Sequence, residues 1–206
     1  MRIGLACEAG PPPADVLDLL EAAGLPAASL RGAAPPALLR HDAGLWLLGS
    51  AGDVLRACAR GALDAGIVGS DRLLEGRLGV ADLLDLHRSR DELVVAVLPG
   101  GRPERRLRIA TRYLETARRH FAAAGAQPDI LILDEPSLAP ALGLADGVVE
   151  LRSRLAASPS GAPQLEVREV VAPCSAHLVA ARAARVLLRD EFGVLVTRLR
   201  AAMEDR

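Results

Sequence analysis

The sequence contains no lysine, few aromatic residues and only three cysteines. Every basic residue other than histidine is arginine, and Ala, Gly, Pro and Leu are abundant, which indicates a compositional bias of the genome rather than a device of the fold. Cys7, Cys58 and Cys174 are an odd number, with no CxxC spacing and no histidine at ligand spacing. The cysteines are therefore expected to be small buried apolar residues, and a disulfide framework or a zinc site is excluded.

Neither sign of charge is in excess, since 25 basic and 26 acidic residues give a formal net charge of -1. This balance excludes the basic surface of a nucleic-acid-binding protein and a polybasic membrane patch. The first apolar run, Ile3–Ala6, is too short for a signal peptide, and no run approaches the length of a membrane span. A hydrophobic content of 50% is enough to build a core. We therefore expect a globular protein of the reducing cytoplasm that binds small molecules or other proteins.

Apolar runs of strand length alternate with helical patterns along most of the chain. Such alternation predicts an α/β protein with mainly parallel sheets. A strand-like run over Glu92–Leu98, followed by a break rich in Pro and Gly, lies between two such series. We therefore expect a two-lobed arrangement with a cleft between the lobes, similar to that of periplasmic binding proteins. Residues 1–88 and 173–206 would form lobe 1, and residues 89–172 would form lobe 2.

Capping and breaking residues predict the ends of several helices. A helix over Asp53–Ala62 is expected to open with an aspartate cap, and a short helix is expected over Ser137–Leu142. The last helical stretch, Ala184–Met203, is expected to contain a break at Gly193. Because ligands of open α/β sheets lie beyond the carboxyl ends of the strands, the loops that follow strands are where a site is expected.

One such loop carries Asp71, in the segment Gly69-Ser70-Asp71 between a predicted strand and a predicted helix. Its backbone N–H groups and hydroxyl suit a phosphate or a ribose. The Asp71 carboxylate itself suits a hydroxyl, an amine or bound magnesium. A helix N-cap is the favoured alternative, because Ser and Asp cap helices in any protein.

Arginines mark two further loops. Arg112 follows the predicted strand Arg108–Thr111, where its guanidinium could fork onto a phosphate. The loop over residues 152–164 contains two prolines, each of which removes a backbone donor. An ordinary flexible connection is as well supported there as a weakened anion site. The polar candidates at its start are Arg152, Ser153 and Arg154.

No constellation for nucleophilic catalysis is evident, since the sequence has no GxSxG motif and no cysteine in a recognised catalytic signature. The four histidines lie among acidic and apolar neighbours and are expected to be structural or exposed. These are His41, His87, His120 and His177. Catalytic residues are therefore left unassigned, and no protein metal ligands are predicted.

Three segments, Leu63–Glu75, Arg108–Tyr113 and Leu138–Glu150, resemble the catalytic subunit of ATP phosphoribosyltransferase in order and spacing. The length resembles the short form of that family, which works with a histidyl-tRNA-synthetase-like regulatory subunit. The resemblance implies transfer of phosphoribosyl from phosphoribosyl pyrophosphate to ATP, with magnesium, in the first step of histidine biosynthesis. It also implies a homo- or hetero-oligomer. The family's phosphoribosyl pyrophosphate loop would follow Glu150, which is itself a candidate substrate-binding residue.

The loops depart from the family pattern. Ala6–Ala9 stands where the family has a Lys-Gly-Arg turn, and Ser50-Ala51 stands where it has Arg-Pro. Asp134–Ser137 stands at a Gly-Ser-x-Glu stretch, and Arg152–Ala157 replaces the Thr-Gly-x-Thr-Leu core. These departures support an alternative, a diverged paralogue that is catalytically impaired or uses a changed acceptor and binds a nucleotide or a partner. The basic residues after Glu150 could replace the lost donors as point charges.

Overall fold

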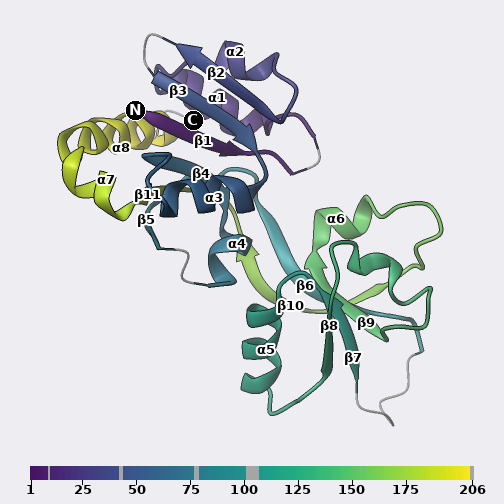
Figure 1. Ribbon diagram of the computed structural model, residues 1–206. Helices are drawn as coiled ribbons and strands as arrows, with labels where there is room; N and C mark the ends of the chain where they lie inside the picture. Colours follow the sequence, from purple (N-terminus) through teal and green to yellow (C-terminus); the bar gives the residue numbers. More distant parts are fainter. Residues whose placement is uncertain (9, 42–43, 77–78, 101–106, 205–206) are drawn as a thin grey trace. The chain divides into compact units, whose positions relative to one another are not determined.

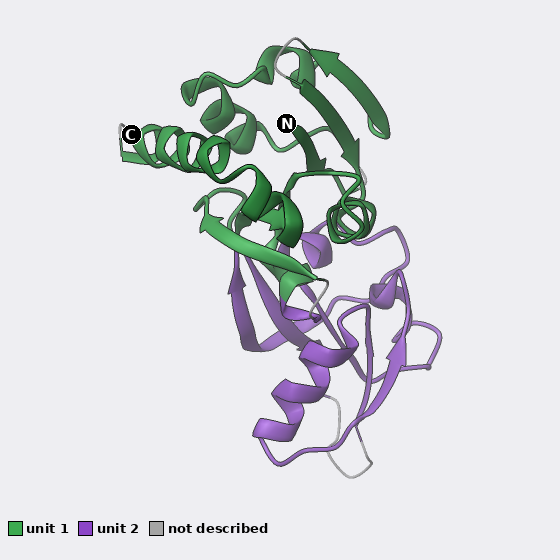
Figure 2. Cartoon of the chain, turned by 60° about the vertical axis from the view of Figure 1, so that its left-hand side comes forward, with its two compact units in different colours: residues 1–73, 77–90, 175–206 green, residues 74–76, 91–174 purple. Residues whose placement is uncertain are grey.

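The computed structural model describes residues 1–206 except 9, 42–43, 77–78, 101–106 and 205–206. The chain divides into two compact units, each with its own sheet (Figures 1 and 2). Unit 1 comprises residues 1–73, 77–90 and 175–206, and unit 2 comprises residues 74–76 and 91–174. The α/β class expected from the sequence is confirmed.

Unit 1 contains a six-stranded sheet in the order β2-β3-β1-β4-β11-β5. Its centre is parallel, because β1 pairs in parallel with both β3 and β4. The outer pairs are antiparallel. The strands are β1 (Arg2–Ala6), β2 (Ala37–His41), β3 (Gly44–Gly49), β4 (Ala65–Gly69), β5 (Val80–Asp85) and β11 (Ala176–Ala181).

Unit 2 contains a five-stranded sheet in the order β10-β6-β9-β7-β8. The strand β7 pairs in parallel with β8 and β9, whereas β6 pairs antiparallel with β9 and β10. The strands are β6 (Asp91–Val97), β7 (Arg108–Thr111), β8 (Asp129–Ile132), β9 (Gly147–Leu151) and β10 (Glu166–Cys174).

The prediction of mainly parallel sheets was therefore wrong, since both sheets are mixed. Parallel neighbours need a crossover of about a dozen residues or more, whereas a hairpin joins antiparallel strands. Only two residues separate His41 of β2 from Gly44 of β3 in the sequence, so these strands pair as a hairpin. Only Ser175 separates β10 from β11, so the chain enters the sheet of unit 1 without a crossover helix.

The longer helices bury apolar side chains. In α1, for example, Val16, Leu17, Leu19 and Leu20 are buried. The helices of unit 1 are α1 (Ala14–Ala22), α2 (Ala27–Arg31), α3 (Ala51–Ala59), α4 (Ser70–Leu74, whose last residue is assigned to unit 2), α7 (Arg182–Leu187) and α8 (Arg189–Glu204). Those of unit 2 are α5 (Leu114–Ala123), the 3-10 helix η1 (Pro136–Leu138) and α6 (Arg152–Ala156).

Three predicted boundaries were wrong. Ser50 rather than Asp53 caps α3, because its side chain accepts a hydrogen bond from the Asp53 N–H. The terminal helical stretch breaks at Leu188, between α7 and α8, and Gly193 lies inside α8. The helix expected over Ser137–Leu142 is the single 3-10 turn η1, which starts one residue earlier at a proline.

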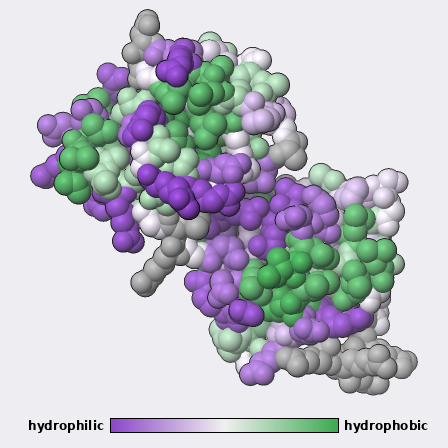
Figure 3. All heavy atoms as spheres, in the orientation of Figure 1, coloured by the Kyte–Doolittle hydropathy of each residue, from purple (hydrophilic) through white to green (hydrophobic). Residues whose placement is uncertain are grey.

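The outer edge of the sheet in unit 2 is apolar and exposed. The edge strand β8 leaves Leu131 and Ile132 exposed by 38% and 58%, and Leu142 of the following turn is exposed by 71%. Figure 3 shows hydrophobic side chains gathered on the surface of this unit. No described helix is long and apolar enough to cross a membrane.

Candidate functional site

The carboxyl ends of β7 and β9 bring two predicted site residues together. These strands run side by side in parallel, with Thr111 opposite Val149. Arg112, directly after β7, and Glu150, the next residue of β9, therefore meet at the same edge of the sheet. The Thr111 hydroxyl donates to the Val149 carbonyl at 2.7 Å and accepts from the Tyr113 N–H at 2.9 Å, which ties this corner together.

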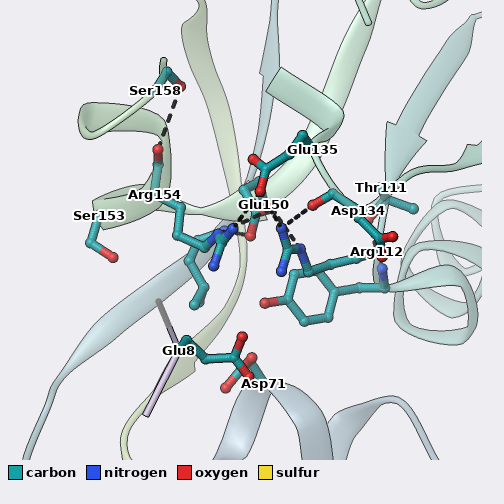
Figure 4. Close-up of polar contacts among 12 residues, drawn as sticks. Glu8, Asp71, Thr111, Arg112, Asp134, Glu135, Glu150, Ser153, Arg154 and Ser158 are labelled. Carbon is teal, nitrogen blue, oxygen red and sulfur yellow. Dashed lines mark hydrogen bonds and ion pairs between the residues drawn. The ribbon is translucent and has the colours of Figure 1, made fainter. Parts of the chain in front are cut away.

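At this edge, two arginines both contact one carboxylate oxygen of each of two glutamates (Figure 4). Oε2 of Glu150 lies 3.1 Å from Nε of Arg112 and 3.8 Å from Nε of Arg154. Oε1 of Glu135 lies 3.3 Å from Nη2 of Arg154 and 3.8 Å from Nη2 of Arg112. Each arginine thus contacts Glu150 through Nε and Glu135 through Nη2. We call these four residues the charge ring.

Burial distinguishes the two carboxylates of the charge ring. The Glu150 side chain is only 3% exposed and that of Arg112 is 11% exposed, whereas that of Glu135 is 59% exposed. Oε1 of Glu150 also accepts the Leu151 N–H at 2.8 Å. A buried carboxylate is costly unless it is paired, so Glu150 depends on these partners. With two cations and two anions, the ring carries no net formal charge.

Arg112 is further fixed by a backbone carbonyl in the segment that follows β8. Its Nη2 donates to the backbone carbonyl of Asp134, which follows β8. This contact and the Glu150 pair hold the guanidinium from two sides. The side chain is therefore oriented in advance of any ligand.

Arg152 and Ser153 do not join the charge ring. Arg152 pairs with Glu92 of β6, with Nε at 2.8 Å and Nη2 at 2.7 Å from Oε2. The Ser153 hydroxyl donates to the Asp91 carboxylate. Because these residues lie on α6, where successive side chains point in different directions, only Arg154 turns toward Glu150. The segment expected to be a loop thus begins with a short helix held to β6.

Asp71 is the second residue of α4 in unit 1, shortly after the end of β4, and is 7% exposed. A Cβ added at Gly69 would lie 2.1 Å from Oδ1 of Asp71, so the carboxylate lies against its own strand. Nε of Arg72 is 3.8 Å from Oδ2 of Asp71. The neighbouring Ser70 hydroxyl accepts the Ser175 N–H at 3.1 Å, which links α4 to the start of β11. This end of unit 1 is therefore held by its own side chains.

The Glu8 side chain lies against the amino-terminal end of α3 in unit 1. Its Oε1 accepts the Ala51 N–H at 3.1 Å, and its Oε2 lies 3.9 Å from Nη2 of Arg72. A carboxylate is stabilised there by the helix dipole. The neighbouring Cys7 is buried, which raises the pKa of its thiol to about 11, with the Glu8 charge adding to the effect and a hydrogen bond with the Gly49 backbone opposing it. The Cys7 thiol is thus protonated at neutral pH, not a nucleophile.

Each histidine has a side-chain neighbour within reach of a hydrogen bond or an ion pair. The closest ring-nitrogen distances are 2.8 Å for Ser29–His41, 3.0 Å for Asp85–His87, 3.1 Å for Glu169–His120 and 3.0 Å for Asp82–His177. Within the described residues, no three His, Cys, Asp or Glu side chains form a group that could hold a metal ion. Burial alone would raise the pKa of Asp85, but hydrogen bonds from Ser175 and His87, with the nearby histidines, lower it.

Glu135 is the member of the charge ring that the sequence did not assign to the site. The acidic pair Asp134-Glu135 is visible as a departure from the family pattern, but its contact with Arg154 joins residues 19 positions apart. That contact depends on the turn at η1, which directs the chain from β8 back toward β9. No local pattern encodes it.

The chain is similar to known proteins over most of its length. A sequence model of the family described as ATP phosphoribosyltransferase matches residues 50–201. The ATP phosphoribosyltransferase of Halorhodospira halophila is 38% identical over 166 residues, covering 79% of this chain and 76% of the relative. That of Azoarcus sp. is 41% identical over 138 residues, covering 63% of this chain and 64% of the relative.

Solved structures show the same fold. A chain of the ATP phosphoribosyl transferase (HisG:HisZ) complex from Thermotoga maritima has a TM-score of 0.78 at 20% identity, with 100% of both chains covered. Arginine-bound ArgBP from T. maritima has a TM-score of 0.56 at 14% identity, covering 100% of this chain and 94% of that one. The second likeness agrees with the expected similarity to periplasmic binding proteins. With a family match over residues 50–201 and relatives such as that of H. halophila, the chain belongs to the ATP phosphoribosyltransferase family.

Proposed function

We propose that the chain transfers the phosphoribosyl group of phosphoribosyl pyrophosphate to ATP, as the first step of histidine biosynthesis. The observation that carries this proposal is the charge ring. It sets two arginines at the carboxyl edge of β7 and β9, Arg112 in the family segment Arg108–Tyr113 and Arg154 shortly after the family segment Leu138–Glu150. Ligands of open α/β sheets bind at this edge, and paired guanidinium groups suit the oxygens of a phosphate or a pyrophosphate.

The reaction needs positioning and charge stabilisation more than covalent help. N1 of the adenine forms a bond to C1 of the ribose, while the bond from C1 to the pyrophosphate oxygen breaks and the pyrophosphate leaves with the electron pair. Arg112 and Arg154 would stabilise the charge that grows on this leaving group. Glu150 would act as a positioning residue, because it contacts Nε of both arginines.

Magnesium would enter with the substrates rather than bind to the protein alone. Glu150 is already bonded to Arg112 and to the Leu151 N–H, and the described part of the chain offers no cluster of three metal-ligating side chains. Magnesium commonly keeps several waters and is held by substrate phosphates plus one or two carboxylates. The proposed reaction therefore has no step that uses a metal bound by this chain alone.

A partner subunit of the histidyl-tRNA-synthetase type is part of the proposal. Support comes from the solved T. maritima chain, which is part of a HisG:HisZ complex, and from the exposed apolar residues Leu131 and Ile132 of the edge strand β8. Exposed apolar patches of this kind commonly mark protein interfaces. Co-purification with a candidate subunit, followed by light scattering, tests whether a hetero-oligomer forms. The cytoplasmic location stays a prediction.

The decisive assay follows phosphoribosyl-ATP formation from ATP, phosphoribosyl pyrophosphate and magnesium, with and without the candidate subunit. Arg154→Ala should lower kcat/KM by about 100-fold, as expected for loss of one charge-stabilising donor. Arg60→Ala, an exposed arginine of α3's C-terminal end in unit 1, is the matched control and should retain wild-type turnover. Absence of turnover under every condition would refute the transferase and favour the diverged paralogue.

A further inference from the structure

The two arginines of the charge ring present unequal sides to their carboxylates. Glu150 lies on the buried side, contacts both Nε atoms and is fixed by the Leu151 N–H. Glu135 lies on the exposed side and contacts both Nη2 atoms through the single oxygen Oε1. Because the Glu135 side chain is 59% exposed and that of Glu150 only 3%, Glu135 is the carboxylate that an incoming ligand could replace beside the Nη2 atoms.

We propose that Glu135 is an internal stand-in for a phosphate oxygen, and that it must move away before a phosphate or pyrophosphate group binds to Arg112 and Arg154. This inference deepens the proposed function, on which it rests for the identity of the natural ligand. A carboxylate oxygen and a phosphate oxygen make the same kind of charge-assisted hydrogen bond to a guanidinium. Oε1 of Glu135 already bridges the two arginines at 3.3 and 3.8 Å, as one oxygen of a bound phosphate would.

The ring can release Glu135 without collapsing. Arg112 would keep its contacts with Glu150 and with the Asp134 carbonyl, and Arg154 would keep Glu150. The remaining group, Arg112, Arg154 and Glu150, carries a net formal charge of +1, which favours an anion. Exposed ion pairs are weak, so a multiply charged ligand is able to displace Glu135, whereas a monovalent anion gains little from doing so.

Glu135 therefore weakens the binding of anions to Arg112 and Arg154. Its carboxylate competes for both Nη2 atoms and, once displaced, still repels a ligand bound a few ångströms away. Glu135→Gln keeps the size of the side chain and removes the charge. Together, loss of competition and loss of repulsion predict pyrophosphate binding about tenfold tighter in Glu135→Gln than in wild type.

The test is calorimetric titration of the full chain with inorganic pyrophosphate. Glu166→Gln removes the same charge from an exposed side chain of β10 in the same unit and is the matched control. We expect tighter binding in Glu135→Gln, wild-type binding in Glu166→Gln, and loss of the gain when Arg154→Ala is added to Glu135→Gln. A second titration with chloride should show no comparable gain.

Three outcomes would overturn the inference. These are equal affinity in wild type and Glu135→Gln, an equal gain in Glu166→Gln, and absence of pyrophosphate binding in all proteins at millimolar concentration. The proposed function is judged separately by phosphoribosyl-ATP formation. Tighter pyrophosphate binding in Glu135→Gln without turnover in any variant would support the stand-in role of Glu135 and refute the transferase.

Discussion

Arg112→Met tests the structural part of the charge ring, because it leaves the buried Glu150 carboxylate without its nearest cation. Removing one partner of a buried ion pair costs about 3 to 5 kcal/mol. Two contacts of Glu150 persist in the variant, with Nε of Arg154 at 3.8 Å and the Leu151 N–H at 2.8 Å. We therefore expect the lower end of that range, about 3 kcal/mol of unfolding free energy.

A second variant separates the burial of charge from the loss of packing. Arg112→Met combined with Glu150→Leu replaces the pair with apolar side chains of similar volume, which is often close to neutral for stability. The double variant should thus recover about 2 kcal/mol relative to Arg112→Met alone. Arg154 keeps Glu135 as a partner in that background.

The chain provides a separate optical reporter for each unit. Its single tyrosine, Tyr113, is 1% exposed in unit 2, and its single tryptophan, Trp46, is 2% exposed in unit 1. Urea unfolding followed by tyrosine absorbance and by tryptophan fluorescence therefore assigns the loss of stability to a unit. Arg112→Met should lower the urea midpoint of the transition seen by tyrosine absorbance more than that of the transition seen by tryptophan fluorescence. A double variant no more stable than the single one would refute the argument that buried charge dominates.

Three further outcomes are expected. Burial alone would raise the pKa of Asp64, but hydrogen bonds from Arg2 outweigh it and lower the pKa. Asp64 thus stabilises the fold above its unfolded pKa of about 3.9, and in urea titrations the difference between wild type and Asp64→Asn should vanish as pH falls through the lowered value. Burial raises the thiol pKa of Cys7 to about 11 and of Cys58 to about 12, so a disulfide exchange reagent should react with both at neutral pH only after unfolding. Gly193→Ala should raise the melting temperature and stabilise the fold by about 0.5 to 1 kcal/mol. Gly193 is exposed inside α8, and a Cβ added there would have no atom within 4 Å beyond its chain neighbours and its own helix backbone. A decrease would contradict the helical assignment.

The sequence predicted the elements whose apolar runs are buried. The strands β1, β4 and β9 are almost fully buried, and their nearly continuous apolar residues are the pattern that indicates such strands. The edge strands β2 and β5 were missed, because half-exposed edges mix polar and apolar residues. The antiparallel pairs were also missed, since strand partners are set by connections and by distant segments rather than by local pattern.

The proximity of two candidate residues follows from their positions along the strands. Arg112 comes directly after β7 and Glu150 is the fourth residue of β9, and the carboxyl edge of a parallel pair brings such residues together. Their role as site residues stays a prediction. The choice among Arg152, Ser153 and Arg154 depends on the rotation of α6, which a segment assigned to a loop does not reveal. Glu135 depends on the turn after β8. Family membership defines the region, and the side-chain geometry identifies which arginines face each other.

The order in which the ribosome makes the chain constrains how unit 1 can form. Its strand β11 lies between β4 and β5 in the sheet, and β5 has no other strand partner among the described residues. Yet β11 begins at Ala176, after all of residues 91–174 of unit 2 have been synthesised. In the nascent amino-terminal segment, β1 to β4 can pair with one another, but β5 has to remain unpaired until β11 has been synthesised. Apart from residues 74–76, unit 2 is one continuous insertion, so it can fold first during translation. The sheet of unit 1 is completed only when β11 has been synthesised.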